Sequence, residues 1–417
     1  MRLVYTLLLY LLVPWIMLRL VWRSWREAGY LENVGERFGN YRKTAGAPLI
    51  WVHAVSVGET RAAQPLIQAL FRDYPQYYVL ITHMTPTGRE AGRELYRGHV
   101  ERCYLPYDLP GAVADFLDHY NPHAGILMET EIWPNLIHGC SSRGIPLYLV
   151  NARLSQKSWA GYRRFAGFTR ASLAGLAGIA AQSAEHAERF TSLGARNVVV
   201  TGSIKFDVTP PPDQIELART LRRLYGEGRP VLLAASTREG EEELILDELK
   251  HIEVPSLLTV LVPRHPRRFD SVAGLIEQRG IKLQRRTDEA PIDPDTRVVL
   301  GNSMGEMFAY YGACDLAFIG GSLLPFGGHN LIEASAMGKP VLIGPSVYNF
   351  PEPVRWAVEA GVAIQVRNAR ALAREATRLL LDPEASRRMG DAAAAFCADH
   401  RGATAKIVDL IKLKKTE

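Results

Sequence analysis

The sequence contains little cysteine and no strong excess of charge of either sign. Its four cysteines stand far apart among 417 residues, so neither a C-x-x-C redox pair nor a cysteine-based zinc cluster is present. We therefore expect free thiols in a reducing compartment. The formal net charge of +5 is small and evenly spread, which argues against nucleic-acid binding, where a basic stripe is expected. A mildly basic balance fits acidic substrates or an anionic lipid surface.

The sequence also lacks repeats, low-complexity tracts and an acidic tail. No dense set of Asp and His residues has the spacing of a metal site, which agrees with a metal-independent reaction. Hydrophobic residues make up 47% and charged residues 22% of the chain, the composition of an ordinary globular protein. At ~100–200 residues per domain, this length predicts two or three domains.

The first residues form the one long apolar run. Residues 3–18 carry no charge, and residues 20–22 extend the run past Arg19, whose long side chain can snorkel. A tilted membrane span and an interfacial anchor both remain open, with a buried helix of a soluble domain as the alternative. A cleaved secretory signal is disfavoured because bulky and basic residues follow the run, without a small-residue cleavage site. More positive charge follows the run than precedes it, which predicts that the remaining chain lies on the cytoplasmic side.

From Pro48 onward, short apolar runs alternate with helix-like stretches, a pattern typical of strand-helix-strand units with a parallel sheet. A proline-rich segment at 208–213 is predicted to be neither helix nor central strand and to mark a domain boundary. We therefore predict an α/β protein with two doubly wound, Rossmann-like domains that face each other across a cleft. The predicted strands are 49–54, 78–82, 125–128, 147–151 and 198–201 in the first domain, and 231–235, 257–262, 297–300, 316–319 and 341–343 in the second.

Ligands of such sheets bind beyond the carboxyl ends of the strands, so the loops there are the places to look for chemistry. Glu59 follows the first predicted strand in a segment of small residues that suits a tight strand-to-helix loop. At a helix N-terminus the dipole favours an ionised carboxylate, which could take a proton from a sugar hydroxyl. An ordinary carboxylate at a helix N-terminus explains the position equally well.

Two more carboxylates, Glu129 and Glu131, follow the predicted strand that ends at Met128. If that strand continues, alternation directs both side chains to one face, and spacing alone does not rank them. Lys205, with Asp207 nearby, follows the last predicted strand of the first domain and could neutralise a phosphate. A solvated surface lysine is the simpler alternative.

The second predicted domain has the clearest pattern. Gly320-Gly-Ser322 closes one strand, and Phe326-Gly-Gly-His-Asn-Leu-Ile-Glu333 opens the next helix. Glycines let the backbone approach a phosphate, helix N-terminal amides bind its oxygens, and a glutamate in the helix can accept hydrogen bonds from ribose hydroxyls. Pro263-Arg-His-Pro266 adds a fork-shaped donor, and Asn302-Ser-Met-Gly-Glu306 is a further polar loop.

Taken together, these stretches resemble the 3-deoxy-D-manno-octulosonic acid (Kdo) transferase family of lipopolysaccharide biosynthesis over nearly the whole chain. The matching segments are Gly35-Glu-Arg-Phe-Gly39, His53-Ala-Val-Ser-Val-Gly-Glu59, Met128-Glu-Thr-Glu-Ile-Trp-Pro-Asn135, Asn151-Ala-Arg-Leu-Ser155, Gly202-Ser-Ile-Lys-Phe-Asp207, Val262-Pro-Arg-His-Pro266 and Gly327-Gly-His-Asn330. The resemblance implies a GT-B glycosyltransferase that moves Kdo from CMP-Kdo to a lipid A precursor, lipid IVA, with inversion and without a metal or other cofactor.

The resemblance also implies residue roles. It makes Glu59 the general base and gives Glu129 and Lys205 supporting or transition-state-stabilising roles, with Glu131 and Asp207 as the open alternatives. The implied CMP contacts are Pro263, Arg264, Met304, Gly305, Glu306, Asn330, Leu331, Ile332 and Glu333.

The sequence patterns and the family resemblance together predict the organisation of the chain. It comprises a membrane anchor at 1–26, an acceptor-binding domain at 27–207, a linker at 208–228 and a CMP-sugar-binding domain at 229–417, whose last helix could pack back on the first domain. The expected location is the cytoplasmic side of the inner membrane, with CMP-Kdo, the lipid A precursor and the membrane as partners and no nucleic acid. Two rivals remain: another GT-B enzyme, such as a UDP-sugar transferase or epimerase, and a catalytically silent membrane-bound nucleotide-binding protein. The number of Kdo units added and the oligomeric state are not predicted.

Overall fold

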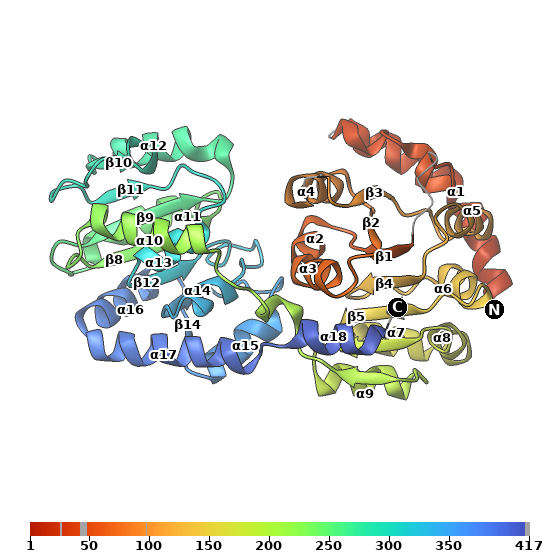
Figure 1. The fold of residues 1–417 in the computed structure, drawn as a ribbon. Coiled ribbons are helices and arrows are strands. Elements are labelled where there is room, and N and C mark those ends of the chain that lie inside the picture. Colours follow the sequence, from red (N-terminus) through yellow and green to blue (C-terminus); the bar gives the residue numbers. More distant parts are fainter. Residues whose placement is uncertain (26, 42–47, 97, 413–417) are drawn as a thin grey trace. The chain divides into compact units, whose positions relative to one another are not determined.

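The computed structural model describes residues 1–25, 27–41, 48–96 and 98–412 (Figure 1). Arg26, the end of the predicted anchor, and the last lysines of the chain, Lys414 and Lys415, lie outside these residues. The chain forms two compact units. The first unit is Met1–Asp207 with Arg401–Glu417, and the second unit is Val208–His400.

The first unit is built on a parallel sheet of seven strands in the order β3-β2-β1-β4-β5-β6-β7. The chain turns from one half of this sheet to the other between the neighbouring strands β1 and β4, which makes the ends of those strands the topological switch point. The strands are β1 (Leu49–His53), β2 (Tyr78–His83), β3 (Glu101–Tyr104), β4 (Ala124–Met128), β5 (Leu147–Ala152), β6 (Gly178–Ala181) and β7 (Val198–Val200).

The second unit has a parallel sheet of seven strands in the order β10-β11-β9-β8-β12-β13-β14, with its switch point between β8 and β12. This confirms the predicted class of two doubly wound sheets. The strands are β8 (Val231–Thr237), β9 (Leu258–Pro263), β10 (Leu283–Arg285), β11 (Val298–Leu300), β12 (Leu316–Ile319), β13 (Val341–Ile343) and β14 (Ala363–Gln365).

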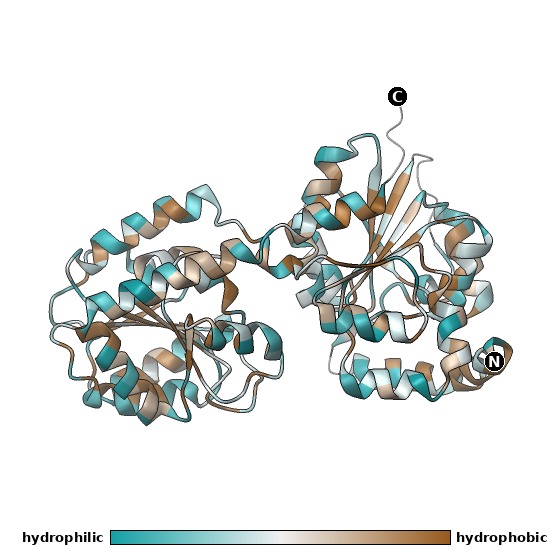
Figure 2. Cartoon of the chain, turned by 90° about the horizontal axis from the view of Figure 1, so that it is seen from below, coloured by the Kyte–Doolittle hydropathy of each residue, from teal (hydrophilic) through white to brown (hydrophobic). Residues whose placement is uncertain are grey.

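Amphipathic helices cover both sheets, whose central strands are buried on both faces (Figure 2). Strands β1 and β4 are buried at every position. The helices of the first unit are α1 (Arg2–Ser24), α2 (Val57–Ala62), α3 (Gln64–Asp73), α4 (Pro86–Tyr96), α5 (Pro110–Tyr120), α6 (Pro134–Ser142), α7 (Gln156–Arg163), α8 (Ala166–Leu173), α9 (Ala184–Ser192) and α18 (Ala403–Ile411). Those of the second are α10 (Pro212–Tyr225), α11 (Glu241–Glu248), α12 (Phe269–Gln278), α13 (Met307–Ala313), α14 (Ile332–Ala336), α15 (Pro351–Glu359), α16 (Ala369–Leu381) and α17 (Pro383–Asp399).

The proline-rich segment differs from its prediction. Helix α10 begins at Pro212, so Pro212 and Asp213 are helical, and most of the predicted linker at 208–228 is a helix of the second unit. The prediction that no helix forms at 208–213 was wrong for Pro212 and Asp213. Proline fits the first turn of a helix, because no backbone N–H is needed there and the φ of proline is already suitable. At the other end of the chain, α18 packs on α3, and the Tyr148 hydroxyl donates to the Ile411 carbonyl over 2.9 Å. Residues 401–412 are therefore part of the first unit.

Helix α1 is apolar and lies against the first unit by its N-terminal turns. An 18-residue stretch of the helix has a mean hydropathy of 2.0, and among the described residues this is the one helix long and apolar enough to cross a membrane. Only Leu20 is buried, while Leu3, Leu11 and Leu18 are each more than 65% exposed. The Tyr5 hydroxyl donates to Asp108 over 2.9 Å, and Thr6 exchanges hydrogen bonds with the Asn135 side chain. A soluble core helix is thus excluded, because this helix exposes its apolar side chains.

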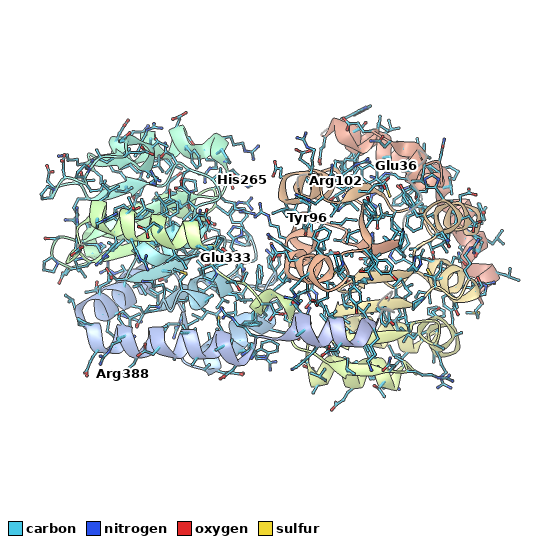
Figure 3. All side chains as sticks on the ribbon, in the orientation of Figure 1. Glu36, Tyr96, Arg102, His265, Glu333 and Arg388 are labelled. Carbon is cyan, nitrogen blue, oxygen red and sulfur yellow. The ribbon has the colours of Figure 1, made fainter. Side chains whose placement is uncertain are left out.

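The Gly35–Gly39 segment has a structural role in the first unit. Arg89 binds Glu36 through two hydrogen bonds of 2.7 and 3.2 Å, and the Tyr104 amide donates to the same carboxylate. Figure 3 labels Glu36 in the first unit. Arg37 is buried, lies 3.9 Å from the Tyr104 ring centroid and donates to a carbonyl beyond β2. Bidentate and stacked arginines of this kind fix geometry. The Gly35–Gly39 segment, which precedes β1, is therefore held against the β2–β3 edge of the sheet.

Candidate functional site

Glu59 lies at the switch point of the first sheet, in the first turn of α2 directly after β1. Ser56 caps this helix, and the Glu59 carboxylate accepts the Val55 amide over 2.9 Å and the Ser56 hydroxyl over 3.2 Å. Burial raises the pKa of Glu59 to about 7, helped by the nearby charges of Glu129 and Glu131 and opposed by the Val55 hydrogen bond. A carboxyl with this pKa exchanges a proton near neutral pH, as a general base must.

Glu129 lies on the other side of the same switch point, one residue after β4. Its backbone has φ = 61°, a left-handed conformation that costs energy for a residue other than glycine. The strand therefore does not continue, and alternation does not align Glu129 with Glu131. The Glu129 side chain is buried and paired with two cations, the Lys205 ammonium at 3.0 Å and the Arg153 guanidinium at 2.9 Å.

Glu131 has a different partner. The Trp133 indole donates to its carboxylate over 2.6 Å, and burial, with the charge of Glu129, raises its pKa despite this bond. The two carboxylates that spacing could not rank are thus distinct, since Glu129 holds the cation pair. The sequence analysis did not select Arg153, although this arginine lies within the matching segment Asn151–Ser155.

Lys205 and Asp207 are also separated by the structure. Both follow β7 around a short 3-10 turn, but Lys205 reaches Glu129, whereas Asp207 accepts the Gly402 and Thr404 amides over 2.6 and 2.5 Å. Asp207 therefore caps α18. The backbone of Asn151 is left-handed, with φ = 50°. Its side-chain oxygen accepts the Ile204 amide over 3.2 Å and so holds the turn that carries Lys205.

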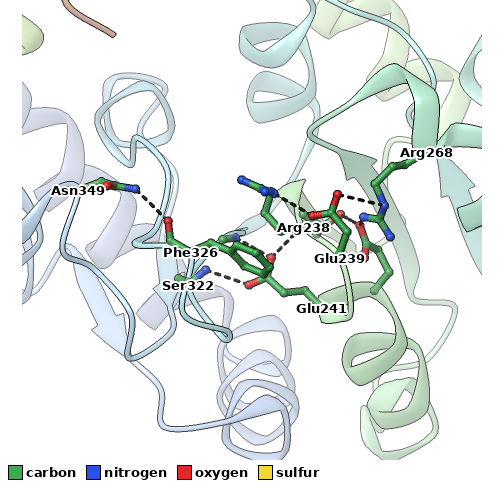
Figure 4. Close-up of polar contacts among 10 residues, drawn as sticks. Arg238, Glu239, Glu241, Arg268, Ser322, Phe326 and Asn349 are labelled. Atoms are coloured by element: carbon green, nitrogen blue, oxygen red, sulfur yellow. Dashed lines mark hydrogen bonds and ion pairs between the residues drawn. The ribbon is translucent and has the colours of Figure 1, made fainter. Parts of the chain in front are cut away.

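The glycine-rich loop of the second unit is organised by a residue that the sequence analysis did not select. The buried carboxylate of Glu241 accepts the amides of Gly321, Ser322 and Leu323 over 2.6 to 2.9 Å, together with the Arg238 amide (Figure 4). These loop amides are therefore occupied by the protein's own anion and cannot bind a phosphate at the same time. The run of acidic residues at 241–243, at the start of a helix, was the signal for this role.

The loop holds its shape through close backbone packing. A side chain at Gly320 would place its Cβ 2.6 Å from the Ser236 carbonyl oxygen, and one at Gly344 would meet the Ser322 backbone at 2.3 Å. Gly328 has φ = +71° and donates to the Gly321 carbonyl. The glycines thus serve the turn's own packing, and the predicted reason for them, a close approach to phosphate, is not needed to explain them.

Asn330 and Glu333 meet directly. Helix α14 begins at Ile332, later than predicted, so Asn330 precedes it. The Asn330 amide group donates to Glu333 over 3.3 Å, and its carbonyl oxygen accepts the Ile332 amide over 3.1 Å. In the part of the chain that the structure describes, the backbone amides of Asn330 and Leu331 donate to no protein group. These amides can therefore donate to a ligand, and the CMP contacts predicted at 330–333 stay a prediction.

The other predicted donor contacts follow neighbouring strands of the same sheet. Pro263 is the last residue of β9, and the Arg264 amide donates to the Thr237 carbonyl over 3.0 Å. After β11, Met304 is 57% exposed and Gly305 has φ = +79°. Glu306 accepts the Ser303 hydroxyl over 2.6 Å and pairs with Arg286 at 3.2 Å. His265 and Glu333 lie on the same side of the second unit (Figure 3).

The remaining features of the chain that bear on its chemistry are its cysteines and its possible metal ligands. All four cysteines are free thiols, as predicted, and the structure buries each of them. Within residues 1–25, 27–41, 48–96 and 98–412, no group of three or more His, Cys, Asp or Glu side chains is arranged to hold a metal ion.

Comparison with known proteins identifies the family. The family described as 3-deoxy-D-manno-octulosonic-acid transferase (kdotransferase) matches residues 32–208, and glycosyl transferases group 1 matches residues 260–396. The chain is 42% identical to the 3-deoxy-D-manno-octulosonic acid transferase of Bordetella pertussis over 98% of both chains. It is 38% identical to the enzyme of the same name from Haemophilus influenzae, over 99% of this chain and 98% of that one.

The chain belongs to the Kdo transferase family. This confirms the resemblance given by its sequence segments and makes the protein a glycosyltransferase of lipopolysaccharide synthesis.

Solved structures agree on the fold. The UDP-GlcNAc 2-epimerase of Neisseria meningitidis is 18% identical, with a TM-score of 0.59 over 87% of this chain and 99% of that one. A glycosyltransferase of Rickettsia africae is 15% identical, with a TM-score of 0.57 over 90% of this chain and 100% of that one. The GT-B fold class is therefore confirmed.

Proposed function

We propose that the protein transfers Kdo from CMP-Kdo to a lipid A precursor, lipid IVA, with inversion and without a metal. The observation that carries this proposal is the switch point of the first sheet, where a glutamate with a pKa of about 7 lies near a buried carboxylate held by two cations. A Kdo transferase needs a base for the acceptor hydroxyl, and Glu59 has the chemistry of one.

These groups suit a direct displacement. Glu59 removes the proton of the attacking glucosamine hydroxyl. The hydroxyl oxygen forms the new bond to the anomeric carbon of Kdo, and the bond from that carbon to the CMP phosphate oxygen breaks. Direct displacement inverts that carbon. Glu129 holds Arg153 and Lys205 in place before the reaction, so these charges can stabilise developing charge without reorganising. Proton removal by a carboxylate and charge stabilisation by arginine and lysine need no metal.

The second unit binds the donor in this proposal. The free amides at Asn330 and Leu331, the Asn330–Glu333 pair and Arg264 supply the neutral, acidic and cationic groups that a nucleotide needs. Glu333 would accept the ribose hydroxyls, and Arg264 would bind the phosphate.

We expect Glu333→Gln to weaken CMP binding by roughly 1–3 kcal/mol, the cost of losing a charge-assisted hydrogen bond. Calorimetric titration of CMP into the variant and into wild type measures this loss. Glu59→Gln is the paired control and should leave CMP affinity nearly unchanged, since Glu59 belongs to the other unit. Equal weakening by both substitutions would contradict the division into an acceptor unit and a donor unit.

Helix α1 is the membrane anchor in this proposal, and it lies in the plane of the membrane surface. A spanning helix would carry its N-terminal turn across the bilayer, away from the globular unit. Here that turn is tied to the unit through Tyr5 and Thr6, while the apolar side chains along the helix are exposed. An exposed apolar helix held flat can enter the headgroup and acyl boundary from one side. The proposed location is the cytoplasmic side of the inner membrane.

Deletion of residues 1–26 should release the protein from membranes. It should also reduce the use of lipid-dispersed acceptor more than the use of a soluble analogue, because the helix provides location and takes no part in the chemical step. Sedimentation with vesicles and rates on both acceptors measure the two effects. Leu7→Gln with Leu11→Gln is a milder matched variant that keeps the Tyr5 and Thr6 contacts. Unchanged sedimentation of both proteins would show that another surface anchors the unit.

The donor distinguishes the proposal from its rivals. With lipid acceptor present, we expect CMP release from CMP-Kdo and no UDP release from UDP-GlcNAc, at the same rate with and without EDTA. Activity with the UDP-sugar alone would favour the UDP-sugar transferase or epimerase. CMP binding without any turnover would favour a silent nucleotide-binding protein. Loss of activity in EDTA, restored by a divalent cation, would refute the metal-independent reaction.

A further inference from the structure

Two arginines follow neighbouring strands at the carboxyl end of the second sheet. Strands β8 and β9 are neighbours, and Thr237 pairs with Pro263 at their carboxyl ends. Arg238 and Arg264 are the next residues of the two strands, and the Arg264 amide donates to the Thr237 carbonyl over 3.0 Å. Only Arg264 is among the contacts that the family resemblance implies, so Arg238 has no role in the proposal above.

The guanidinium of Arg238 is held from two sides. Its Nε donates to Glu239 over 3.1 Å, and its central carbon lies 4.5 Å from the ring centroid of Phe326, in the glycine-rich loop (Figure 4). Asn349 fixes that loop by donating to the Phe326 carbonyl over 3.0 Å. The two terminal amino groups of Arg238 donate to no residue that the structure describes, and the side chain is 27% exposed. The fork is therefore pre-oriented and has donors left for a ligand.

The acidic side chains around Arg238 are each engaged by other groups. The third arginine nearby, Arg268, pairs with the buried Glu242 at 2.5 Å, and Glu241 is used by backbone amides. Glu239 is shared between Arg238 and Arg268 and is 44% exposed. Burial, followed by the positive charges of Arg264 and Arg238, lowers the pKa of His329 to about 4, so this imidazole is neutral near pH 7.

We infer that Arg238 recognises the carboxylate of the donor's acid sugar, beside the phosphate that Arg264 binds. This inference rests on the proposed CMP-Kdo donor. In that donor the carboxylate and the phosphate oxygen are attached to the same carbon, so two anionic groups must be bound at one place. The structure provides two arginines there, each directly after the last paired residue of adjacent strands. A planar guanidinium with two free amino groups matches a carboxylate through two parallel hydrogen bonds.

The same arrangement explains selection of an acid sugar. A donor with a neutral sugar would leave the Arg238 amino groups facing no anion, whereas the acid sugar satisfies them. A site built to bind a polar group rejects a ligand that lacks it, because its own polar groups then stay unpaired. Arg238 is therefore a specificity-determining residue that binds the donor.

The test compares two ligands that differ by the sugar. CMP carries the phosphate without the carboxylate, and CMP-Kdo carries both; without lipid acceptor, both are titrated by calorimetry into wild type and variants. Arg238→Gln should weaken CMP-Kdo binding by roughly 10- to 100-fold, the effect of a lost charge-assisted pair, and change CMP binding by less than about twofold. Arg264→Gln should weaken both ligands. Arg388→Gln, on the exposed face of α17, should weaken neither (Figure 3).

Other results would overturn the inference. Equal weakening of CMP and CMP-Kdo by Arg238→Gln would place this arginine on the phosphate or in the support of the loop. Unchanged binding of both would make it a surface arginine paired with Glu239. Arg238→Lys keeps the charge and disturbs the Phe326 packing less, and it should retain part of the preference for CMP-Kdo over CMP. If wild type binds CMP but not CMP-Kdo, the proposed donor itself fails, and the two failures are distinguishable.

Discussion

Replacement of Glu59 by glutamine should lower kcat by about 10²–10⁴-fold, the usual contribution of a positioned general base. The amide keeps the size of the side chain and can still accept the Val55 amide, so the fold and CMP affinity should persist. Steady-state kinetics with CMP-Kdo and lipid acceptor measure the loss. Glu90→Gln on α4 is a matched control in the same unit, because Glu90 is half exposed and pairs with Arg93 at the surface. Substantial residual transfer by Glu59→Gln would refute its role as base.

The pH dependence of the reaction tests the same carboxylate without a mutation. Burial raises the pKa of Glu59 to about 7, and the base acts in its deprotonated form. Below that pH the active fraction falls, so kcat/KM should decrease about tenfold per pH unit on the acid side and level off above it. The limb should be absent from the residual activity of Glu59→Gln. A profile that is flat from pH 5 to 8 would contradict a base with this pKa.

Replacement of Lys205 by methionine should have the second largest effect, a fall in kcat of about 10²–10³-fold with little change in CMP affinity. Its ammonium lies 3.0 Å from Glu129, and fixed charges of this kind at a reacting centre carry roughly this share of a rate. Without it, Glu129 keeps only the Arg153 partner among its two ion pairs. Lys205→Arg should recover part of the rate, since it restores a positive charge at this position.

Asp207→Ala is the informative control for Lys205, because both residues belong to one matching segment. Loss of its two amide hydrogen bonds should destabilise α18 by about 0.5–2 kcal/mol, as expected for an N-terminal cap, and leave kcat within severalfold. Urea unfolding followed by tryptophan fluorescence measures the first effect, since every tryptophan except Trp356 lies in the first unit. If Asp207→Ala lost activity and Lys205→Met did not, the assignment of the two residues would be reversed.

Sequence reasoning found the strands with strongly apolar runs and missed those with polar or small residues. Runs such as 316–319 and 341–343 match β12 and β13 residue for residue, because a parallel strand buried on both faces is apolar throughout. The missed strands β3, β10 and β14 contain charged or polar residues and lie at or next to sheet edges, and β6 is Gly-Ile-Ala-Ala. Their pairing is set by the neighbouring strand, which a local pattern cannot show.

The site was predictable where it follows strand ends and less so where it depends on backbone geometry. Glu59 and Glu129 could be placed because they follow strands that flank the switch point. The choice of Glu129 over Glu131 depended on a left-handed turn and on Lys205, which is 76 residues away in sequence. The acidic run at 241–243 marks Glu241 as a candidate, but only tertiary structure shows that it binds the glycine-loop amides from another strand-to-helix connection.

The measurement that tests the central claim most directly is the mass of the lipid product. Purified full-length protein is incubated with CMP-Kdo and lipid IVA in EDTA, and the lipid fraction is analysed by mass spectrometry beside a Glu59→Gln control. The account predicts a mass increase by one or more whole Kdo residues with wild type, and almost none with the variant. Unmodified lipid IVA after prolonged incubation with wild type, with the donor intact, would contradict it.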